Sequence, residues 1–314
     1  MSELSNLRRP LRIGTRGSPL ALWQARHVLT MLRQTWPQLA DDGALEIVEI
    51  TTTGDKVQNR LLSEIGGKGL FSKEIEEAMA DNQIDLAVHS MKDVETTLAD
   101  GFVIAAVLER ADPRDAWIST SGYGLDDMPT GAKVGTASLR RRAQVLARRP
   151  DLEVVPFRGN VGTRLRKLAE GQADATLLAQ AGLDRLGMGD TATETLAPSI
   201  MLPPAAQGAV GIECRVNDEV ILQVLAPLNH VETVVTTMAE RHLLAALDGS
   251  CRTPIGAYAT LDGTGGIHIE GLLANDTGTR SWRASRSGLV SDAAALGAEI
   301  GAELRREGDV QVFK

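Results

Sequence analysis

The stretch that decides the fold is "KVGTASLRRRAQVL" (residues 133–146), because it resembles an earlier stretch, "RIGTRGSPLALWQA" (residues 12–25). Each reads as a short strand, a Gly-Thr pair, a serine and then a helix. A second pair matches in the same order, since "ADNQIDLAVHS" (residues 80–90) aligns with "AEGQADATLLA" (residues 169–179). Two ordered matches predict two related α/β domains rather than one large sheet.

The first of these stretches carries the signals of a strand that leads into a helix. Ser18 suits an N-cap and Pro19 suits the first helical position. Apolar residues then recur at helical spacing as far as Trp36. The later run "IDLAVHS" is apolar enough for a strand that is buried on both faces.

The pattern changes after about Val231. A predicted helix over residues 232–247 is followed by three strand-like runs, at 254–261, 266–273 and 279–288. A last helix is expected from about Asp292 to Arg306. This order predicts a third, smaller domain of the α+β type.

The composition is that of a soluble globular protein, with 314 residues, 43% hydrophobic and 24% charged. No apolar run approaches the roughly 20 residues of a membrane span. The first residues have no apolar core of signal-peptide length. Two cysteines do not make a disulfide framework, and a reducing cytoplasm fits these features.

An arginine-rich segment lies within this acidic chain. Between Ala137 and Lys167 there are nine basic and two acidic residues, although the whole chain has a net charge of -8. Nucleic acid is a poor candidate partner, because the pI is about 5.3 and only 3% of the residues are aromatic. The simplest alternative is a solvated helix face.

The positions of the arginines favour an anion site over a solvated face. Arg16 and Arg158 end predicted strands, whereas Arg140, Arg141 and Arg164 begin predicted helices. In open α/β sheets, ligands bind at the carboxyl ends of strands, and helix N-termini favour anions. Several separate arginines suit a ligand with many carboxylates. Four glycines are expected to let the backbone approach that ligand: Gly14, Gly135, Gly159 and Gly162.

Two further stretches could carry chemistry. "HSMKDVE" places Asp93 just after the buried strand. The structural alternative is that Asp93 caps or terminates a turn and that His89 is a hydrogen-bonded histidine. "LDGSCRTPIG" places Cys251 in a Gly-Ser loop beside an arginine, which favours an exposed thiolate. Cys214 reads instead as buried and inert. The cysteines and histidines lack metal-ligand spacing, so no metal is expected.

With these motifs in order, the chain resembles the porphobilinogen deaminase (hydroxymethylbilane synthase) family over nearly its whole length. The stretches that carry the resemblance are "RIGTRGSPLAL", "GGKGLFSKEIE", "DLAVHSMKD", "ERADPRDAW", "VGTASLRRRAQ", "FRGNVGTRLRKL", "AAQGAVGIECR" and "ERHLLAALDGSCRTPIGAY". The resemblance implies an α/β fold in which two bilobal, solute-binding-protein-like α/β domains precede a small C-terminal α+β domain. Its implied boundaries are 1–108 with 209–230, 109–208 and 231–314.

The resemblance also implies an activity. The family is a transferase that condenses four porphobilinogen molecules head to tail, with loss of ammonia, to give hydroxymethylbilane. The product grows on a dipyrromethane cofactor, which a thioether would hold on Cys251. Asp93 matches the catalytic carboxylate. The other implied cofactor ligands are Ser90, Lys92, Thr136, Ser138, Arg140, Arg141, Arg158 and Gly159. The implied substrate ligands are Arg16, Phe71, Arg164, Arg185 and Gln207.

The arginine-rich segment fits this activity, because each pyrrole of the growing chain carries an acetate and a propionate. A fixed carboxylate at Asp93 would stabilise the cation that forms as ammonia leaves, and it would help remove the proton lost in coupling. The alternative is a bilobal carboxylate-binding protein without catalysis, which has no use for Cys251. The segment 51–69 is expected to form a lid over the cleft.

We expect a cytoplasmic monomer whose partner is the small molecule porphobilinogen, without a nucleic acid or a membrane. The family assignment also allows a hand-off of the product to uroporphyrinogen-III synthase. Four positions depart from the usual pattern of the family: Glu64 where Lys occurs, Glu95 for Pro, Ala137 for Ser, and Ala206 for Gly.

Overall fold

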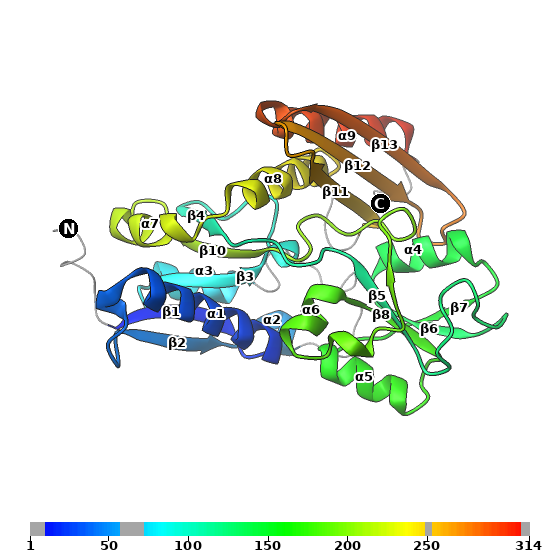
Figure 1. Cartoon of the computed structure of the whole chain (residues 1–314), viewed down its shortest axis with the longest axis horizontal. Coiled ribbons are helices and arrows are strands. Elements are labelled where there is room, and N and C mark those ends of the chain that lie inside the picture. The colour runs from blue at the N-terminus through cyan, green and yellow to red at the C-terminus, as the bar shows by residue number, and fades with distance from the viewer. Residues whose placement is uncertain (1–9, 57–71, 249–252, 309–314) are drawn as a thin grey trace. The chain divides into compact units, whose positions relative to one another are not determined.

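The computed structural model describes residues 10–56, 72–248 and 253–308 of the chain. These residues form two compact units (Figure 1). The first unit contains residues 10–56, 72–110 and 209–234, and the second contains 111–208 with the described residues from 235 onward. Of the predicted lid, only residues 51–56 are described, and they include the short helix α2 (Thr53–Lys56).

The first unit is built on a five-stranded sheet in the order β2-β1-β3-β10-β4. Its strands are β1 (Leu11–Arg16), β2 (Leu45–Ile50), β3 (Leu86–Ser90), β4 (Phe102–Val107) and β10 (Val210–Arg215). Strand β10 is antiparallel to both of its neighbours, whereas β1 is parallel to β2 and β3. The helices of this unit, besides α2, are α1 (Pro19–Thr35), α3 (Lys73–Ala80) and α7 (Glu219–Leu225).

The second unit contains a sheet with the same topology, in the order β7-β6-β8-β5-β9. Its strands are β5 (Asp115–Ser119), β6 (Lys133–Gly135), β7 (Glu153–Val155), β8 (Ala175–Ala179) and β9 (Glu194–Leu196). Here β5 is the strand that is antiparallel to both neighbours. The helices are α4 (Leu139–Arg148), α5 (Val161–Ala169) and α6 (Gln180–Arg185). The predicted pair of related α/β domains is therefore confirmed.

The repeat extends to single hydrogen bonds. Asp85 accepts a hydrogen bond from the backbone N–H of Arg12 (2.8 Å), and Asp174 accepts one from the backbone N–H of Lys133 (2.6 Å). The aspartate thus ties the start of β1 to the turn before β3 in the first sheet, and the start of β6 to the turn before β8 in the second. The aligned stretches of sequence therefore fold alike because they keep the same polar contact.

The remainder of the second unit is the small α+β part that the sequence predicts. An antiparallel sheet contains β11 (Ile255–Leu261), β12 (Gly266–Ala274) and β13 (Ser281–Leu289). Helix α9 (Ala293–Glu307) packs on β12 and β13, and the longer α8 (Val231–Ala246) contributes Leu243 to the same core (Figure 1). The expected fold class is confirmed, and the boundary at residue 231 stays a prediction.

The predicted helix starts are confirmed at both repeats. Ser18 caps α1 by accepting a hydrogen bond from the N–H of Ala21, and Pro19 is the first helical residue. Ser138 caps α4 by accepting one from the N–H of Arg141. One expected strand end is wrong, because β7 ends at Val155 and Arg158 lies in the loop beyond it.

The expectation that four glycines open the backbone to a ligand is wrong for two of them. A Cβ on Gly14 would lie 2.3 Å from Cδ1 of Ile84. A Cβ on Gly135 would lie 2.5 Å from the ring of Phe157. Gly14 lies on β1 and Gly135 on β6, and each makes room for a side chain of the core.

Ala206 has a backbone conformation that favours glycine. Its φ of 60° is in the left-handed region, which costs a residue with a Cβ about 1–2 kcal/mol. The N–H of Ala206 donates to Oε2 of the buried Glu240 at 2.6 Å, and the N–H of Ala259 donates to Oε1 at 2.8 Å. One buried carboxylate on α8 therefore holds the strained residue against β11.

We predict that Ala206→Gly changes the free energy of unfolding by less than about 0.5 kcal/mol. Relief of the left-handed strain offsets the loss of a buried methyl group and the extra freedom of the unfolded chain. Its neighbour Ala205 is also buried but has no positive φ, so Ala205→Gly should lose about 1–2 kcal/mol. Denaturant unfolding of both variants measures this difference, and equal losses would contradict the strain at Ala206.

Candidate active site

A cavity of about 70 Å³ lies in the first unit at the carboxyl ends of β1 and β3. Arg16 is the last residue of β1 and Ser90 the last of β3. Asp93 ends the 3₁₀ turn Met91–Asp93 that follows β3 directly. The cavity wall includes Arg16, Ser18, Gln24, His89, Ser90 and Asp93. Three of the residues implied by resemblance are thus brought together here: Arg16, Ser90 and Asp93.

The carboxylate of Asp93 is partly buried, and no described residue donates a hydrogen bond to it or forms an ion pair with it. The turn is closed by the backbone instead, since the N–H of Val94 donates to the carbonyl of Met91. The turn-capping alternative for Asp93 therefore lacks the contact it requires. The carboxylate is an acceptor on the wall of a cavity, where a donor or a cation of a ligand could reach it.

Ser90 is fixed from the opposite side of the cavity by a residue that sequence reasoning missed. The amide of Gln24 on α1 donates to Oγ of Ser90 at 2.9 Å. Gln24 is only 1% exposed, although it is polar and lies on the helix face that also buries Ala21 and Ala25. A glutamine on the apolar face of an amphipathic helix was the signal that could have revealed it.

Arg16 forms a two-pronged ion pair with Asp55 of α2. Nε of Arg16 lies 3.1 Å from Oδ2 of Asp55, and Nη2 lies 2.5 Å from Oδ1. Burial raises the pKa of Asp55. The hydrogen bonds and charge of Arg16, with a hydrogen bond from Thr52, lower this pKa by more than burial raises it, so the net pKa is below its ordinary value. The predicted substrate ligand Arg16 thus has a carboxylate partner within the protein.

His89 faces the cavity and has an acidic partner behind it. Its Nε2 lies 2.9 Å from Oε2 of Glu213 on β10, and both side chains are almost completely buried. Burial, followed by the nearby charge of Glu213, raises the pKa of Glu76 above its ordinary value. The close approach of His89 to Glu213 is not a hydrogen bond, because Nε2 of His89 and both carboxylate oxygens of Glu213 lack a hydrogen-bond partner among the described residues. The hydrogen-bonded histidine expected from the sequence is therefore not confirmed.

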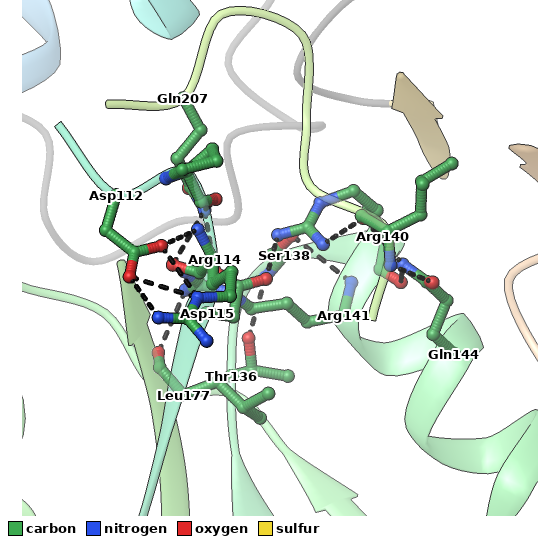
Figure 2. Close-up of polar contacts among 12 residues, drawn as sticks. Asp112, Arg114, Asp115, Thr136, Ser138, Arg140, Arg141, Gln144, Leu177 and Gln207 are labelled. Atoms are coloured by element: carbon green, nitrogen blue, oxygen red, sulfur yellow. Dashed lines mark hydrogen bonds and ion pairs between the residues drawn. The ribbon is translucent and has the colours of Figure 1, made fainter. Parts of the chain in front are cut away.

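In the second unit, the predicted carboxylate ligands Arg140 and Arg141 share one buried aspartate (Figure 2). Their Nη2 atoms lie 2.7 Å from the two carboxylate oxygens of Asp115. The side-chain amide of Gln207 donates to the same carboxylate at 2.9 Å. Burial raises the pKa of Asp115, but the two guanidinium charges outweigh it and hold this pKa well below its ordinary value.

The remaining donors of the two arginines differ. Nη1 of Arg140 donates to the carbonyl of Leu202 (2.7 Å), and Nη1 of Arg141 donates to that of Leu177 (2.9 Å). Nε of Arg141 is buried and has no hydrogen-bond partner within the part of the chain that the structure describes. Two cations share one carboxylate, so this buried cluster has one positive charge in excess. Arg142 is exposed, as expected of the solvated member of the run.

Other predicted ligands lie around the ends of β6 and β7 in the same unit. Thr136 accepts a hydrogen bond from the N–H of Ser138 at 3.2 Å. Nη1 of Arg158 is buried without a hydrogen-bond partner, and Gly159 has a φ of 122°, which a residue with a side chain rarely adopts. Arg164 lies in the first turn of α5.

Arg185 holds a backbone carbonyl of its own unit. Its Nη2 donates to the carbonyl of Gly208 at 2.7 Å, and burial lowers the pKa of the guanidinium. Lys92 lies in the turn beside Asp93.

Cys214 is buried on β10, where burial raises the pKa of its thiol to about 12, so it is inert as predicted. Cys251 and Phe71 lie outside the described residues.

Two negative findings concern only the described parts of the chain. No helix there is long and apolar enough to cross a membrane. No group of three or more histidine, cysteine, aspartate or glutamate side chains there could hold a metal ion.

Comparison with known proteins assigns the chain to a family. The family profile described as "Porphobilinogen deaminase, dipyromethane cofactor binding domain" matches residues 11–223, and that of the C-terminal domain of porphobilinogen deaminase matches residues 234–306. The chain belongs to the porphobilinogen deaminase family. This bears out the resemblance seen in the sequence.

Curated relatives agree over most of the chain. A chloroplastic porphobilinogen deaminase of Pisum sativum is 52% identical over 297 residues, which are 94% of this chain and 80% of the relative. The porphobilinogen deaminase of Chromobacterium violaceum is 50% identical over 293 residues, which are 93% of each chain. Among solved structures, a periplasmic solute binding protein from Desulfovibrio salexigens is 10% identical, with a TM-score of 0.42, over 70% of this chain and 72% of its own.

The described residues fit the dipyrromethane cofactor of this family. Nε of Arg141 and Nη1 of Arg158 are buried N–H donors without acceptors. A buried donor that lacks a partner costs about 1–3 kcal/mol, and a carboxylate is the strongest acceptor for a guanidinium. The acetate and propionate groups of a dipyrromethane would supply such acceptors.

We predict that Asp115→Asn lowers the free energy of unfolding by about 3–5 kcal/mol at pH 7, because two buried guanidinium groups lose their counter-ion. Asp126 pairs with Arg148 at the surface, so the control Asp126→Asn should lose less than about 1 kcal/mol. Thermal or denaturant unfolding of the apo-proteins provides the comparison. A loss at Asp115 as small as that at Asp126 would show that the cluster does not depend on its charge.

The same variant has a defined pH dependence. The pKa of Asp115 is lower in the folded protein than its ordinary 3.8, so its stabilisation is complete above that value and declines as the pH falls toward the folded pKa. The difference between wild type and Asp115→Asn should therefore shrink by about 1 kcal/mol between pH 7 and pH 3. A constant difference over this range would contradict the assignment.

Proposed function

We propose that this protein is a porphobilinogen deaminase that uses Asp93 as its catalytic carboxylate. The activity is that of the family: a transferase condenses four porphobilinogen molecules head to tail, with loss of ammonia, on a dipyrromethane cofactor to give hydroxymethylbilane. The observation that supports Asp93 most is its carboxylate, which lies on a cavity wall without a partner among the described residues. The non-catalytic alternative has no support from the relatives.

The chemistry needs a fixed negative charge beside the reacting pyrrole. Loss of ammonia from porphobilinogen leaves a positive charge spread over the pyrrole ring and its nitrogen. Asp93 stabilises this charge as it develops, because none of the described cationic side chains forms an ion pair with its carboxylate. The same carboxylate can accept the proton that the attacked ring carbon loses. Arginines cannot act as this base, because they stay protonated.

Binding is proposed to divide between the two units. In the first unit, Arg16 takes a substrate carboxylate, whereas Ser90 and Lys92 contribute hydrogen bonds to the cofactor. In the second unit, Arg141 and Arg158 hold the carboxylates of the dipyrromethane through their unpartnered buried donors. When bound through Cys251, the cofactor supplies the terminal pyrrole carbon to which the next unit is joined.

The remaining implied ligands contribute to the same surfaces. Thr136, Ser138, Arg140 and Gly159 shape the cofactor site, in which Arg140 acts through Asp115. Phe71, Arg164, Arg185 and Gln207 are the further substrate ligands in this proposal.

We further propose a monomer that works in the cytoplasm and passes its product to uroporphyrinogen-III synthase. The two cysteines of the sequence, too few for a disulfide framework, support the compartment. The plant relatives are chloroplastic, so a fractionation experiment decides the compartment in this organism.

The first functional prediction concerns covalent loading. Freshly purified active protein should carry an adduct of two pyrrole units on Cys251, seen by intact mass spectrometry under denaturing conditions and located by peptide mapping. Cys251→Ala should fold but contain no adduct and show no activity. An adduct on Cys214, or full activity without any adduct, would refute the proposal.

The second functional prediction concerns Asp93. Asp93→Asn keeps the size of the side chain but removes its charge, so single-turnover elongation should slow by about 10²–10³. Asp93→Glu should keep more activity, because the charge is retained while its position shifts. Elongation is followed by the masses of the enzyme–pyrrole intermediates. If Asp93→Asn elongates within a few-fold of wild type, the catalytic carboxylate lies elsewhere.

A further inference from the structure

The pairing of Arg16 with Asp55 places two binding partners in competition. Arg16 lines the cavity that also contains Asp93, so it is available to a ligand there. The edge of its guanidinium formed by Nε and Nη2 is occupied by the two oxygens of Asp55. This is the same two-pronged geometry that a free acetate or propionate group prefers.

Asp55 is held in this position by its own segment as well as by Arg16. Its Oδ2 accepts hydrogen bonds from Oγ1 of Thr52 at 2.8 Å and from the N–H of Thr52 at 3.4 Å. The next residue, Thr53, donates its N–H to Oε1 of Glu74 at 2.8 Å. The start of α2 is therefore fixed to α3, and the carboxylate is presented to Arg16 by a supported turn rather than by a flexible surface side chain.

The energetic consequence follows from the exchange of one carboxylate for another. A ligand carboxylate that takes the Nε and Nη2 edge of Arg16 must first displace Asp55, so its apparent affinity is its intrinsic affinity multiplied by the fraction of time that the edge is free. The lowered pKa of Asp55 keeps it ionised at neutral pH, so the competition is permanent. Without a ligand, the same pair leaves the partly buried cation of Arg16 neutralised.

We propose that Asp55 is an internal competitor for the substrate carboxylate at Arg16, and that it keeps substrate binding at this position weak and reversible. The proposal rests on the proposed function. Four successive units must each bind and then move on, and a carboxylate held too tightly at Arg16 would delay that step. Asp55 supplies a ready replacement partner each time a pyrrole carboxylate leaves.

The test compares Asp55→Asn with a matched control. Asparagine keeps an oxygen for the hydrogen bonds from Thr52 but loses the charge that binds Arg16, so KM for porphobilinogen should fall about three- to tenfold. kcat should not rise, and intermediates with bound pyrroles should accumulate in the mass spectrum. Glu74→Gln removes a carboxylate that anchors the same segment but does not contact Arg16, and it should leave KM unchanged.

A binding measurement separates this proposal from the proposed function. In the Asp93→Asn background, where turnover is slow, equilibrium titration with porphobilinogen should show tighter binding when Asp55→Asn is added. Tighter binding without any turnover by the wild type would support the competition while refuting the deaminase activity. If Asp55→Asn raises KM or leaves binding unchanged while the wild type is active, Asp55 orients Arg16 or is neutral, and the competition is wrong.

Discussion

One buried carboxylate organises the arginine-rich part of this protein. Asp115 lies on β5 and receives Arg140, Arg141 and Gln207, which reach it from α4 and from the segment before β10. Two guanidinium groups at 5% and 6% exposure would be unstable there without it. Because one carboxylate cannot neutralise two cations, the cluster retains a positive charge inside an acidic chain. That excess, together with a buried N–H that has no acceptor, makes the site attract anions.

The duplicated fold explains why the two units present different chemistry at equivalent places. In each unit a serine caps a helix that follows an equivalent strand: Ser18 caps α1 after β1, and Ser138 caps α4 after β6. The segments after the next parallel strand differ. After β8 the chain continues directly into α6, whereas after β3 it makes only the short 3₁₀ turn that ends at Asp93. The first unit thus presents a carboxylate where the second unit continues a helix. The proposed catalytic group therefore belongs to the first unit, and the buried arginines proposed to hold the cofactor belong to the second.

Most of the fold could be predicted from the sequence. In the site, one residue of each contact could be predicted, but its partner could not. The succession of strands and helices along the chain, the helix caps and most of the arginine positions could be predicted, because they depend on local pattern and on an internal repeat. Asp115, Asp55 and Gln24 could not, because their partners lie 25, 39 and 66 residues away and nothing local marks them. The glycine interpretation failed at Gly14 and Gly135 for a related reason, since the neighbour that needs the space is a core side chain from a distant segment.

The acidic groups around the first cavity differ in what neutralises them, and this difference assigns their roles. Asp55 has Arg16 as a counter-ion. A carboxylate that is already paired stabilises a new positive charge poorly, because the existing cation cancels most of its negative electrostatic potential. Asp93 has no such partner among the described residues, so its negative charge is fully available to a cation that forms within the cavity. The environment of each carboxylate, rather than its type, therefore separates a group that binds and exchanges from a group that can do the chemistry.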